Sequence, residues 1–253
     1  MDLGRRHAAE HHAVTSPAAK ADLFDGFARV AQALGSGRRV EILDILANGE
    51  RTVESLAKTV GLTVANTSQH LQILRRAGLV SGRRDGNHIR YGLAGDDVFS
   101  LWSTLRSVAS TRLAEIERLA AAYLGDRETL EPVTRDELFR RLREKPAPIV
   151  LDVRPAEEYQ SAHVAGAVSI PLAELRKRLR DVPKEREIVA YCRGPYCVYA
   201  HEAVRLLRSR GYSARRLQDG LPEWAAAGLP LGRGAGVARG SRAAGMATAQ
   251  EAT

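Results

Sequence analysis

The hydrophobic pattern of this chain changes its period once, near the acidic stretch GDRETLEPV at residues 125–133. Before this stretch, apolar residues recur every three to four positions, which is the period of amphipathic helices. After it, short continuous apolar runs alternate with helical stretches, as in a parallel sheet covered on both faces. Because 253 residues can bury two cores, the pattern predicts two domains, with residues 125–133 as the linker.

The first half predicts a mainly α winged helix-turn-helix domain over residues 21–124. The expected helices cover residues 24–34, 40–46, 52–59 and 63–77, followed by one long helix over residues 98–123. Between the last two helices, Asp85-Gly86 is a strong hairpin-turn signal and predicts two short strands. A helix of this kind fits the major groove of DNA, and a hairpin beside it can contact the backbone.

Candidate DNA contacts lie on the fourth helix and on the hairpin. They are Asn66, Thr67, Ser68, Gln69 and His70 on the helix, and Arg83, Arg84, His88 and Arg90 on the hairpin. Residues 62–93 hold five arginines against one aspartate, whereas residues 21–124 as a whole hold thirteen basic and eleven acidic residues. Positive charge is therefore concentrated where phosphates would lie. The alternative is an all-helical interaction domain with a solvated arginine hairpin.

The segment LAKTVGLTVANTSQHLQILRRAGLVSGRRDGNHIRYGL resembles the core of the ArsR family of bacterial repressors. The resemblance covers roughly residues 21–124 and implies a homodimer, built on the first and last helices, that binds a palindromic double-stranded operator. It departs from metal-sensing members, because RTVESLAK holds no cysteine and the last helix no histidine. The N-terminal His7, Glu10, His11 and His12 could hold a metal only adventitiously, so no metal site is expected.

The second half predicts an α/β domain over residues 134–231 with a mostly parallel sheet. Candidate strands cover residues 149–153, 167–170, 188–191 and 214–218, and helices lie near 172–180, 199–210 and 221–227. Residues 1–20 and 232–253 are small or polar and are predicted to be disordered ends. No long apolar run or secretory signal is present, and two cysteines make no disulfide framework, so we expect a cytoplasmic protein without a membrane partner.

Both cysteines lie in the stretch IVAYCRGPYCV, where Cys192 follows an apolar strand. The loop over residues 193–197 leads into a helix, so backbone N–H groups, a helix N-terminus and Arg193 would all favour a thiolate. Glycine and proline in this loop favour an exposed, reactive cysteine. The alternative is a buried and inert one.

The domain resembles the rhodanese family, through LDVRPAEEY, HVAGAVSIPL, VAYCRGPYC and LQDGLPEW. The resemblance implies that Cys192 takes a sulfane sulfur as a persulfide from thiosulfate, a polysulfide or another persulfide, with no cofactor. It also implies that the loop Arg193, Gly194, Pro195 and Tyr196 cradles the persulfide anion. We expect structural roles for the other matched residues, Asp152, Arg154, His163, Gly166, Gly220 and Trp224.

Two features narrow the chemistry of this loop. A related phosphatase or arsenate reductase would need an arginine where Val198 stands, so that reaction is disfavoured. Cys197 could attack a persulfide on Cys192 and so act as a resolving thiol, or it could simply be a small residue tolerated in the loop. A soft-metal site made of the two thiols alone would have only two ligands.

Two hypotheses for function follow. In the first, the chain is a repressor whose rhodanese domain senses sulfane sulfur through Cys192. In the second, it is a sulfurtransferase with an uncoupled, autoregulatory DNA-binding domain. The first is favoured because the DNA-binding half lacks recognisable sensor ligands, while a reactive thiol is fused to it.

Overall fold

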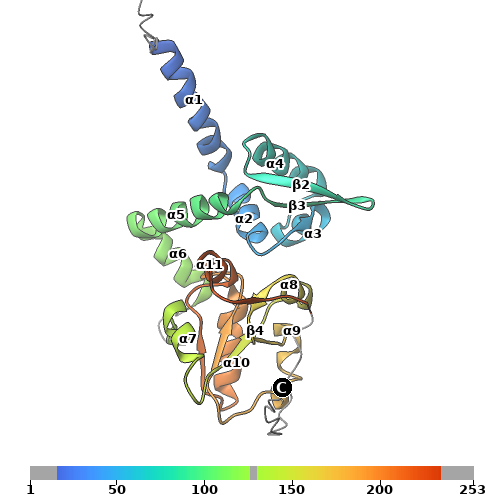
Figure 1. The fold of residues 1–253 in the computed structure, drawn as a ribbon, viewed down its shortest axis with the longest axis vertical. Coiled ribbons are helices and arrows are strands. Elements are labelled where there is room, and N and C mark those ends of the chain that lie inside the picture. Colours follow the sequence, from blue (N-terminus) through green and yellow to red (C-terminus); the bar gives the residue numbers. More distant parts are fainter. Residues whose placement is uncertain (1–15, 126–129, 235–253) are drawn as a thin grey trace, which may run out of the picture.

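A computed structural model describes residues 16–125 and 130–234, which form two units (Figure 1). The first unit is mainly helical and carries a three-stranded antiparallel sheet in the order β1-β3-β2. Its elements are α1 (Pro17–Leu34), α2 (Gly37–Leu46), β1 (Arg51–Thr52), α3 (Val53–Val60), α4 (Val64–Arg76), β2 (Val80–Asp85), β3 (His88–Leu93), α5 (Asp96–Arg112) and α6 (Ala114–Leu124). This is the predicted winged helix-turn-helix.

Local sequence signals set the helix-turn-helix. The Thr52 hydroxyl accepts a hydrogen bond from the Ser55 N–H at the start of α3, and the Thr63 hydroxyl caps α4 in the same way. Gly61 ends α3 at a φ of 66°, a left-handed conformation that favours glycine. The apolar faces of these helices meet in one core of fully buried side chains, which includes Ile42, Leu43, Leu56, Leu71 and Leu74.

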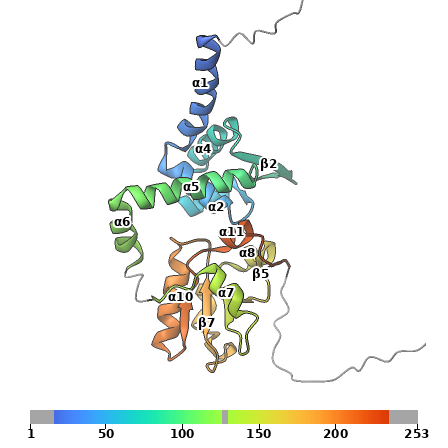
Figure 2. The same ribbon diagram turned by 60° about the vertical axis from the view of Figure 1, so that its left-hand side comes forward.

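Two predictions for the helices of this half are corrected. The first helix begins at Pro17, with Ser16 as its cap, so residues 17–20 are helical and not disordered. The long helix predicted over residues 98–123 breaks at Leu113, whose backbone is extended and separates α5 from α6. Ser110 and Thr111 precede the break and are weak helix formers. Figure 2 shows α6 turning away from α5 toward the second unit.

The second unit is built on a four-stranded parallel sheet in the order β6-β4-β7-β8, which confirms the predicted fold class. A short antiparallel pair, β5 with β9, lies beside it. The elements are α7 (Arg135–Arg141), β4 (Ile149–Asp152), α8 (Ala156–Ser161), β5 (His163–Val164), β6 (Val168–Ser169), α9 (Leu172–Leu175), a 3-10 turn (Leu179–Asp181), β7 (Ile188–Tyr191), α10 (Val198–Ser209), β8 (Ala214–Arg216), α11 (Leu221–Ala226) and β9 (Leu231–Gly232).

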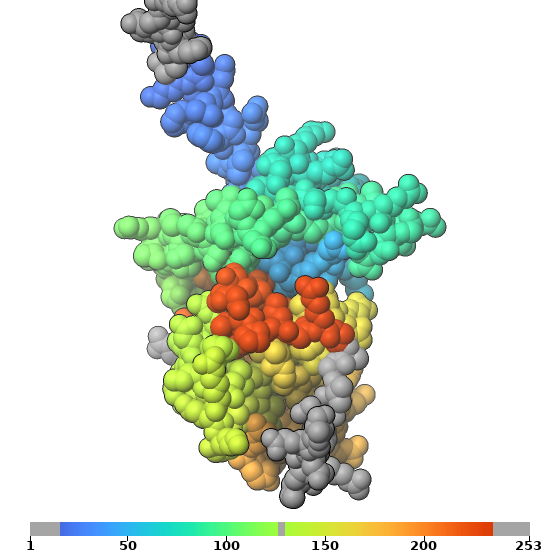
Figure 3. All heavy atoms as spheres, in the orientation of Figure 1, coloured from blue at the N-terminus to red at the C-terminus, as the bar shows by residue number. Residues whose placement is uncertain are grey.

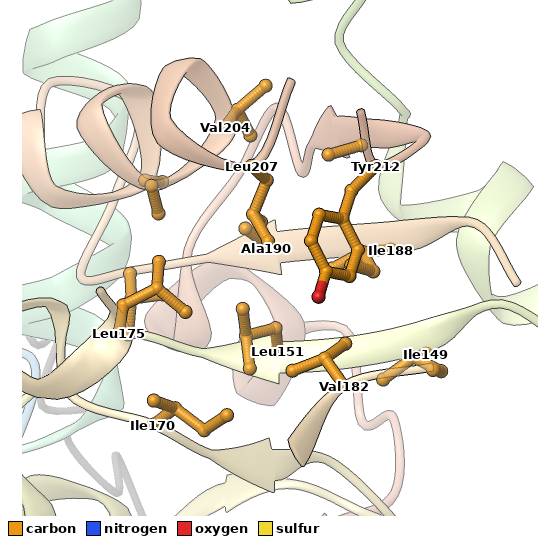
Figure 4. Close-up of a cluster of buried hydrophobic side chains, with 14 of the residues drawn as sticks. Ile149, Leu151, Ile170, Leu175, Val182, Ile188, Ala190, Val204, Leu207 and Tyr212 are labelled. Carbon is orange, nitrogen blue, oxygen red and sulfur yellow. The ribbon is translucent and has the colours of Figure 1, made fainter. Parts of the chain in front are cut away.

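Apolar side chains cover both faces of this sheet. On one face, Leu151 of β4 and Ala190 of β7 pack against Val204 and Leu207 of α10 (Figure 4). On the other face, side chains from the same two strands pack with α11, whose Trp224 is 1% exposed. Burial on both faces explains why these strands are continuous apolar runs in the sequence.

The second unit is larger than predicted at both ends. Val133 is fully buried and pairs with Leu217, and Leu130 also lies in the core, so residues 130–133 belong to this unit and not to the linker. At the other end, Gly232 pairs with His163 in the β5–β9 ribbon. The rest of the predicted linker and tail, residues 126–129 and 235–253, lies outside the described residues.

The two units are in contact. Figure 3 shows the segment that contains α11, in red, between the second unit below and the helices of the first unit above. In Figure 1, α11 lies beside α5, and contacts join the two helices. In the part of the chain that the structure describes, no helix has the length and apolar character needed to cross a bilayer.

Candidate functional site

The two cysteines are joined to each other as a disulfide at the end of β7. Cys192 directly follows the strand and is 1% exposed. Cys197 is the N-cap residue of α10 and is half-buried, and its N–H donates to the carbonyl of Gly194 at 3.2 Å. The expectation that Cys192 is exposed is therefore corrected for this disulfide form. Its side chain is buried, and its sulfur is bonded to the only other cysteine of the chain.

The N-terminal end of helix α11 contacts the backbone of the cysteine loop. The Leu221 N–H donates to the Cys192 carbonyl at 3.2 Å. The loop backbone lies directly on Gly220, where an added Cβ would come within 2.4 Å of Arg193 and Gly194 backbone atoms. The carboxylate of Glu223 accepts a hydrogen bond from the Gly220 N–H at 2.9 Å and so fixes the start of the helix. Only glycine fits at position 220.

Glu158 of α8 is the charged centre beside the loop. Its carboxylate is 3% exposed and accepts hydrogen bonds from the Arg193 guanidinium, the shortest at 2.6 Å. Arg51 of β1, from the first unit, pairs with the same carboxylate at 3.0 Å. Burial lowers the pKa of Arg193, but the hydrogen bonds and charge of Glu158 outweigh it and raise that pKa above its usual value. One buried carboxylate thus joins the cysteine loop to the first unit.

A second buried ion pair lies at the end of β4. Asp152 and Arg154 have fully buried side chains, and the Arg154 Nη2 atom donates to Asp152 Oδ2 at 2.7 Å and to the Ala162 carbonyl at 2.7 Å. Tyr191 of β7 also donates its hydroxyl to Asp152. Burial, followed by the charge of Asp152, raises the pKa of Tyr191 well above its usual value, so it remains a donor. This network fixes the carboxyl ends of β4 and β7, the two central strands of the sheet, in line with the structural roles expected for Asp152 and Arg154.

Helix α5 of the first unit faces the loop. Arg106 donates to Glu223 of α11 at 2.6 Å, and the Ser110 hydroxyl lies 2.9 Å from the Tyr196 hydroxyl of the loop. One turn before, Trp102 donates to Asp44 of α2 at 3.0 Å. Desolvation at this boundary raises the pKa of Asp44, and the Trp102 hydrogen bond opposes that rise.

The predicted DNA contacts on α4 differ in how far their side chains are exposed. Asn66 and Gln69 are exposed and lie three residues apart on one face, while Ser68 and His70 are half-buried. Thr67 is fully buried, and its hydroxyl donates to the Thr63 carbonyl at 3.0 Å. The prediction for Thr67 is corrected, because this side chain is turned into the domain and offers nothing to a base edge.

The β2–β3 hairpin is the wing of the winged helix-turn-helix, and carboxylates partly neutralise its arginines. Arg83 pairs with Glu50 at 2.7 Å and Arg90 pairs with Asp85 at 2.6 Å, all with substantial exposure. Arg84 and His88 are exposed near the turn, where Arg84 donates to the Gly86 carbonyl at 3.3 Å. These surface pairs are weak and can exchange partners with phosphate.

Comparison with known proteins agrees with this division. Residues 36–81 match the model of the bacterial regulatory protein arsR family, and residues 134–227 match that of the rhodanese-like domain. The HTH-type transcriptional regulator Rv0324 of Mycobacterium tuberculosis is 48% identical over 221 residues, which cover 87% of this chain and 96% of that protein. The chain is an ArsR-family transcriptional regulator with a C-terminal rhodanese-like domain.

Two further relatives match one half of this regulator each. A sulfurtransferase of Allochromatium vinosum is 28% identical over 97 residues, which cover 38% of this chain and 89% of that protein. The homodimeric winged helix-turn-helix fragment of a possible ArsR-family regulator from Mycobacterium bovis, solved by NMR, is 46% identical. The match covers 37% of this chain and 87% of the chain of that fragment, with a TM-score of 0.36.

The structure also brings together residues of the regulator that the sequence did not single out. Five side chains from distant segments meet around the cysteine loop: those of Arg51, Ser110, Arg106, Glu158 and Glu223. Glu158 and Glu223 had a usable signal, their places in the phrases LDVRPAEEY and LQDGLPEW. Among the described residues no three side chains form a metal-binding group, and His7, Glu10, His11 and His12 lie outside them.

Proposed function

We propose that this ArsR-family regulator senses sulfane sulfur through Cys192 and that its operator affinity depends on the state of the Cys192 loop. The observation that carries the proposal is the loop itself. Its two cysteines lie within bonding distance of each other, and residues of the DNA-binding half contact both the loop and the carboxylate that holds it. A reactive sulfur pair placed against a DNA-binding domain is suited to a switch.

The chemistry requires two steps. First, the Cys192 thiolate attacks the sulfane sulfur of a polysulfide or persulfide donor, which leaves as the shortened polysulfide or thiolate, and Cys192 becomes a persulfide. Then the Cys197 thiolate attacks the Cys192 sulfur, and the terminal sulfur leaves as hydrosulfide. The two thiols are oxidised to the disulfide, and the sulfane sulfur is reduced to sulfide. A cellular dithiol would return the pair to its reduced form.

A groove beside the loop could admit the donor. It has a volume of about 1060 Å³ and is lined by α8, α9 and α10. Tyr199 lines this groove and also stacks under the Arg193 guanidinium at 5.2 Å. Arg176, Lys177 and Arg205 outnumber Glu174 and Glu202 on its wall, and this net positive charge favours an anionic sulfur donor.

DNA recognition is proposed for the exposed face of α4. We expect Gln69→Ala to weaken binding to the operator by ~1–3 kcal/mol, because a glutamine amide can read an adenine edge through two hydrogen bonds. Binding to unrelated DNA should change little, since backbone contacts from Arg84 and its neighbours remain. Fluorescence anisotropy at fixed salt measures both. An equal loss on operator and unrelated DNA would contradict base recognition by Gln69.

A homodimer is proposed from the apolar faces of α1, α5 and α6. Figure 1 shows α1 projecting from the body, and more than half of the surface of Leu23, Phe24 and Phe27 is exposed on it. Val108 of α5, Leu113 at the break, and Leu119 and Tyr123 of α6 are exposed as well. Exposed apolar stripes of this size mark an interaction surface, and a second copy offers the same stripes in return.

The double variant Phe24→Glu, Phe27→Glu should therefore be monomeric. We expect light scattering to give half the wild-type molar mass and operator affinity to fall at least tenfold, because a dimer engages two half-sites together. Leu231→Glu, which charges an exposed apolar residue in the other half, is the control and should remain dimeric. A double variant of unchanged mass would show that α1 is not part of the interface.

The proposed function is tested by operator binding of the full chain in two states. We expect affinity for the DNA upstream of the gene to differ at least tenfold between reduced and polysulfide-treated protein. Equal affinities would contradict the sensor and favour the alternative, a sulfurtransferase with an uncoupled DNA-binding domain. Steady turnover of thiosulfate with cyanide as acceptor would then support that alternative.

A further inference from the structure

Side chains of the DNA-binding half make three polar contacts that lead to the Cys192 loop of the rhodanese-like half. The first is the ion pair of Arg51 with Glu158. The second is the hydrogen bond between Ser110 and Tyr196. The third is the ion pair of Arg106 with Glu223. Tyr196 belongs to the loop, Glu158 is bonded to Arg193 of the loop, and Glu223 is bonded to the N–H of Gly220, against which the loop backbone lies. A further contact, from the Arg205 guanidinium to the Leu124 carbonyl at 2.6 Å, joins the two halves elsewhere.

The first contact ties the wing sheet to the loop. Arg51 lies in β1 and is paired with Tyr91 of β3, so its backbone belongs to the same sheet as the wing hairpin. Its side chain shares the Glu158 carboxylate with Arg193, which follows Cys192 directly. Because this carboxylate is 3% exposed, water screens its interactions with Arg51, Arg193 and the more distant Arg154 only a little. A movement of Arg193 therefore changes the electrostatic environment of the Arg51 guanidinium.

The second contact reaches from the loop into the DNA-binding half. Tyr196 precedes Cys197, and its ring lines an apolar cavity of about 550 Å³ together with Trp102 and Leu105 of α5 and Ile116 of α6. Its hydroxyl lies 2.9 Å from Ser110, near the C-terminal end of α5. The loop residue next to the second cysteine is thus packed among the helices proposed to form the dimer.

The third contact fixes the N-terminal end of α11, against which the loop backbone lies. Arg106 and Glu223 have side chains that are 13% and 9% exposed, and their closest atoms are 2.6 Å apart. Glu223 also accepts from the Gly220 N–H, and Gly220 is the residue on which the loop backbone lies. Arg106 therefore acts on the loop through α11.

From these contacts we propose that Arg51, Ser110 and Arg106 of the DNA-binding half are positioning residues for sulfur chemistry at Cys192, and that they transmit the state of the loop to the DNA-binding domain. The inference rests on the proposed function and names the residues through which that function is regulated. Opening the disulfide, or adding a sulfur atom to Cys192, changes the space available to residues 193–196. Close-packed interfaces answer such changes by moving between discrete arrangements.

The test measures how fast dithiothreitol reduces the Cys192–Cys197 disulfide in the oxidised full chain. We expect Arg51→Gln and Ser110→Ala each to accelerate reduction at least threefold, because a loosened loop exposes a Cys192 sulfur that is now covered. Two matched controls remove comparable groups elsewhere. Ser100→Ala changes another serine of α5, whose hydroxyl donates to Asp96, and Arg38→Gln breaks an exposed pair with Glu41. Both controls should reduce at the wild-type rate.

A double-mutant cycle separates positioning from general loosening. Ser110→Ala and Tyr196→Phe each remove the same hydrogen bond, so the double variant should react no faster than either single one. Multiplying effects would contradict a role for this bond. Arg106→Gln should also accelerate reduction, and Arg106→Lys should restore most of the wild-type rate because it keeps the charge opposite Glu223.

Operator affinity of the same variants distinguishes this inference from the proposed function. If the wild type shows no affinity difference between its reduced and oxidised forms, the sensor function fails, whatever the reduction rates are. If the wild type shows a tenfold difference, we expect Arg51→Gln and Ser110→Ala to reduce it below threefold. A full tenfold response in both variants, with reduction at the wild-type rate, would overturn the inference and leave the sensor intact.

Discussion

Cys192→Ser is expected to form no persulfide at position 192 and to bind operator DNA equally well before and after polysulfide treatment. A serine hydroxyl neither accepts sulfane sulfur as a stable persulfide nor forms a disulfide with Cys197. The at least tenfold change expected for the wild type should therefore vanish completely. Intact-mass spectrometry of the treated protein measures the added sulfur, and anisotropy on the same sample measures operator affinity.

Cys197→Ser is the matched control for that result. It keeps the thiol of Cys192, so mass spectrometry should find one added sulfur on Cys192 that persists, because no second thiol releases it as hydrosulfide. In the wild type the same treatment should end in the Cys192–Cys197 disulfide found in the structure. If Cys192→Ser still changed its affinity on treatment, another group would be the sensor, and the account of Cys192 would be contradicted.

The second large effect concerns the stability of the rhodanese-like half. Asp152→Asn should lower its free energy of unfolding by about 3–5 kcal/mol, because the buried Arg154 charge would keep only Glu158, 4.0 Å away, as a carboxylate partner. Both side chains are fully buried, and Asp152 also accepts from Tyr191. Urea unfolding followed by tryptophan fluorescence is the measurement, since Trp224 lies in the core of this half.

Glu144→Gln provides the comparison for Asp152→Asn. Glu144 pairs with Arg140 on α7, but both side chains are at least half exposed. Solvent screens that pair, so its loss should change the free energy of unfolding by less than ~0.5 kcal/mol. Equal effects of the two substitutions would show that the Asp152–Arg154 pair is not the buried support that the structure describes.

Local patterns predicted most of the fold. The strand over residues 188–191 and the helix-turn-helix follow from continuous apolar runs, capping threonines and the glycine at position 61, all of which act over a few residues. The break at Leu113 was not predicted, because apolar spacing continues through it and the turn of α6 depends on the second half. Thr67 lies among polar neighbours, and only the fold shows that its face of α4 is turned inward.

The site was predicted in part. The cysteine loop lies within one segment and could be recognised from its motif, and the structure places the two sulfurs together. The contacts that this loop makes with the first half of the chain could not be predicted from the motif. Arg51 and Glu158 are separated by more than a hundred positions, and arginine–glutamate pairs are too common in this chain for the sequence to select one. Their meeting depends on how the two halves dock.

The central claim is that the Cys192 loop and the operator site influence each other, and linkage gives the most direct measurement of it. If the disulfide and dithiol forms differ tenfold in operator affinity, saturating operator must shift the equilibrium between those forms tenfold, which is about 30 mV for a two-electron couple. The fraction of disulfide is measured in dithiothreitol redox buffers, with and without operator DNA. We predict a midpoint shift of at least that size with operator and none with unrelated DNA. Identical midpoints in all three samples would contradict the account.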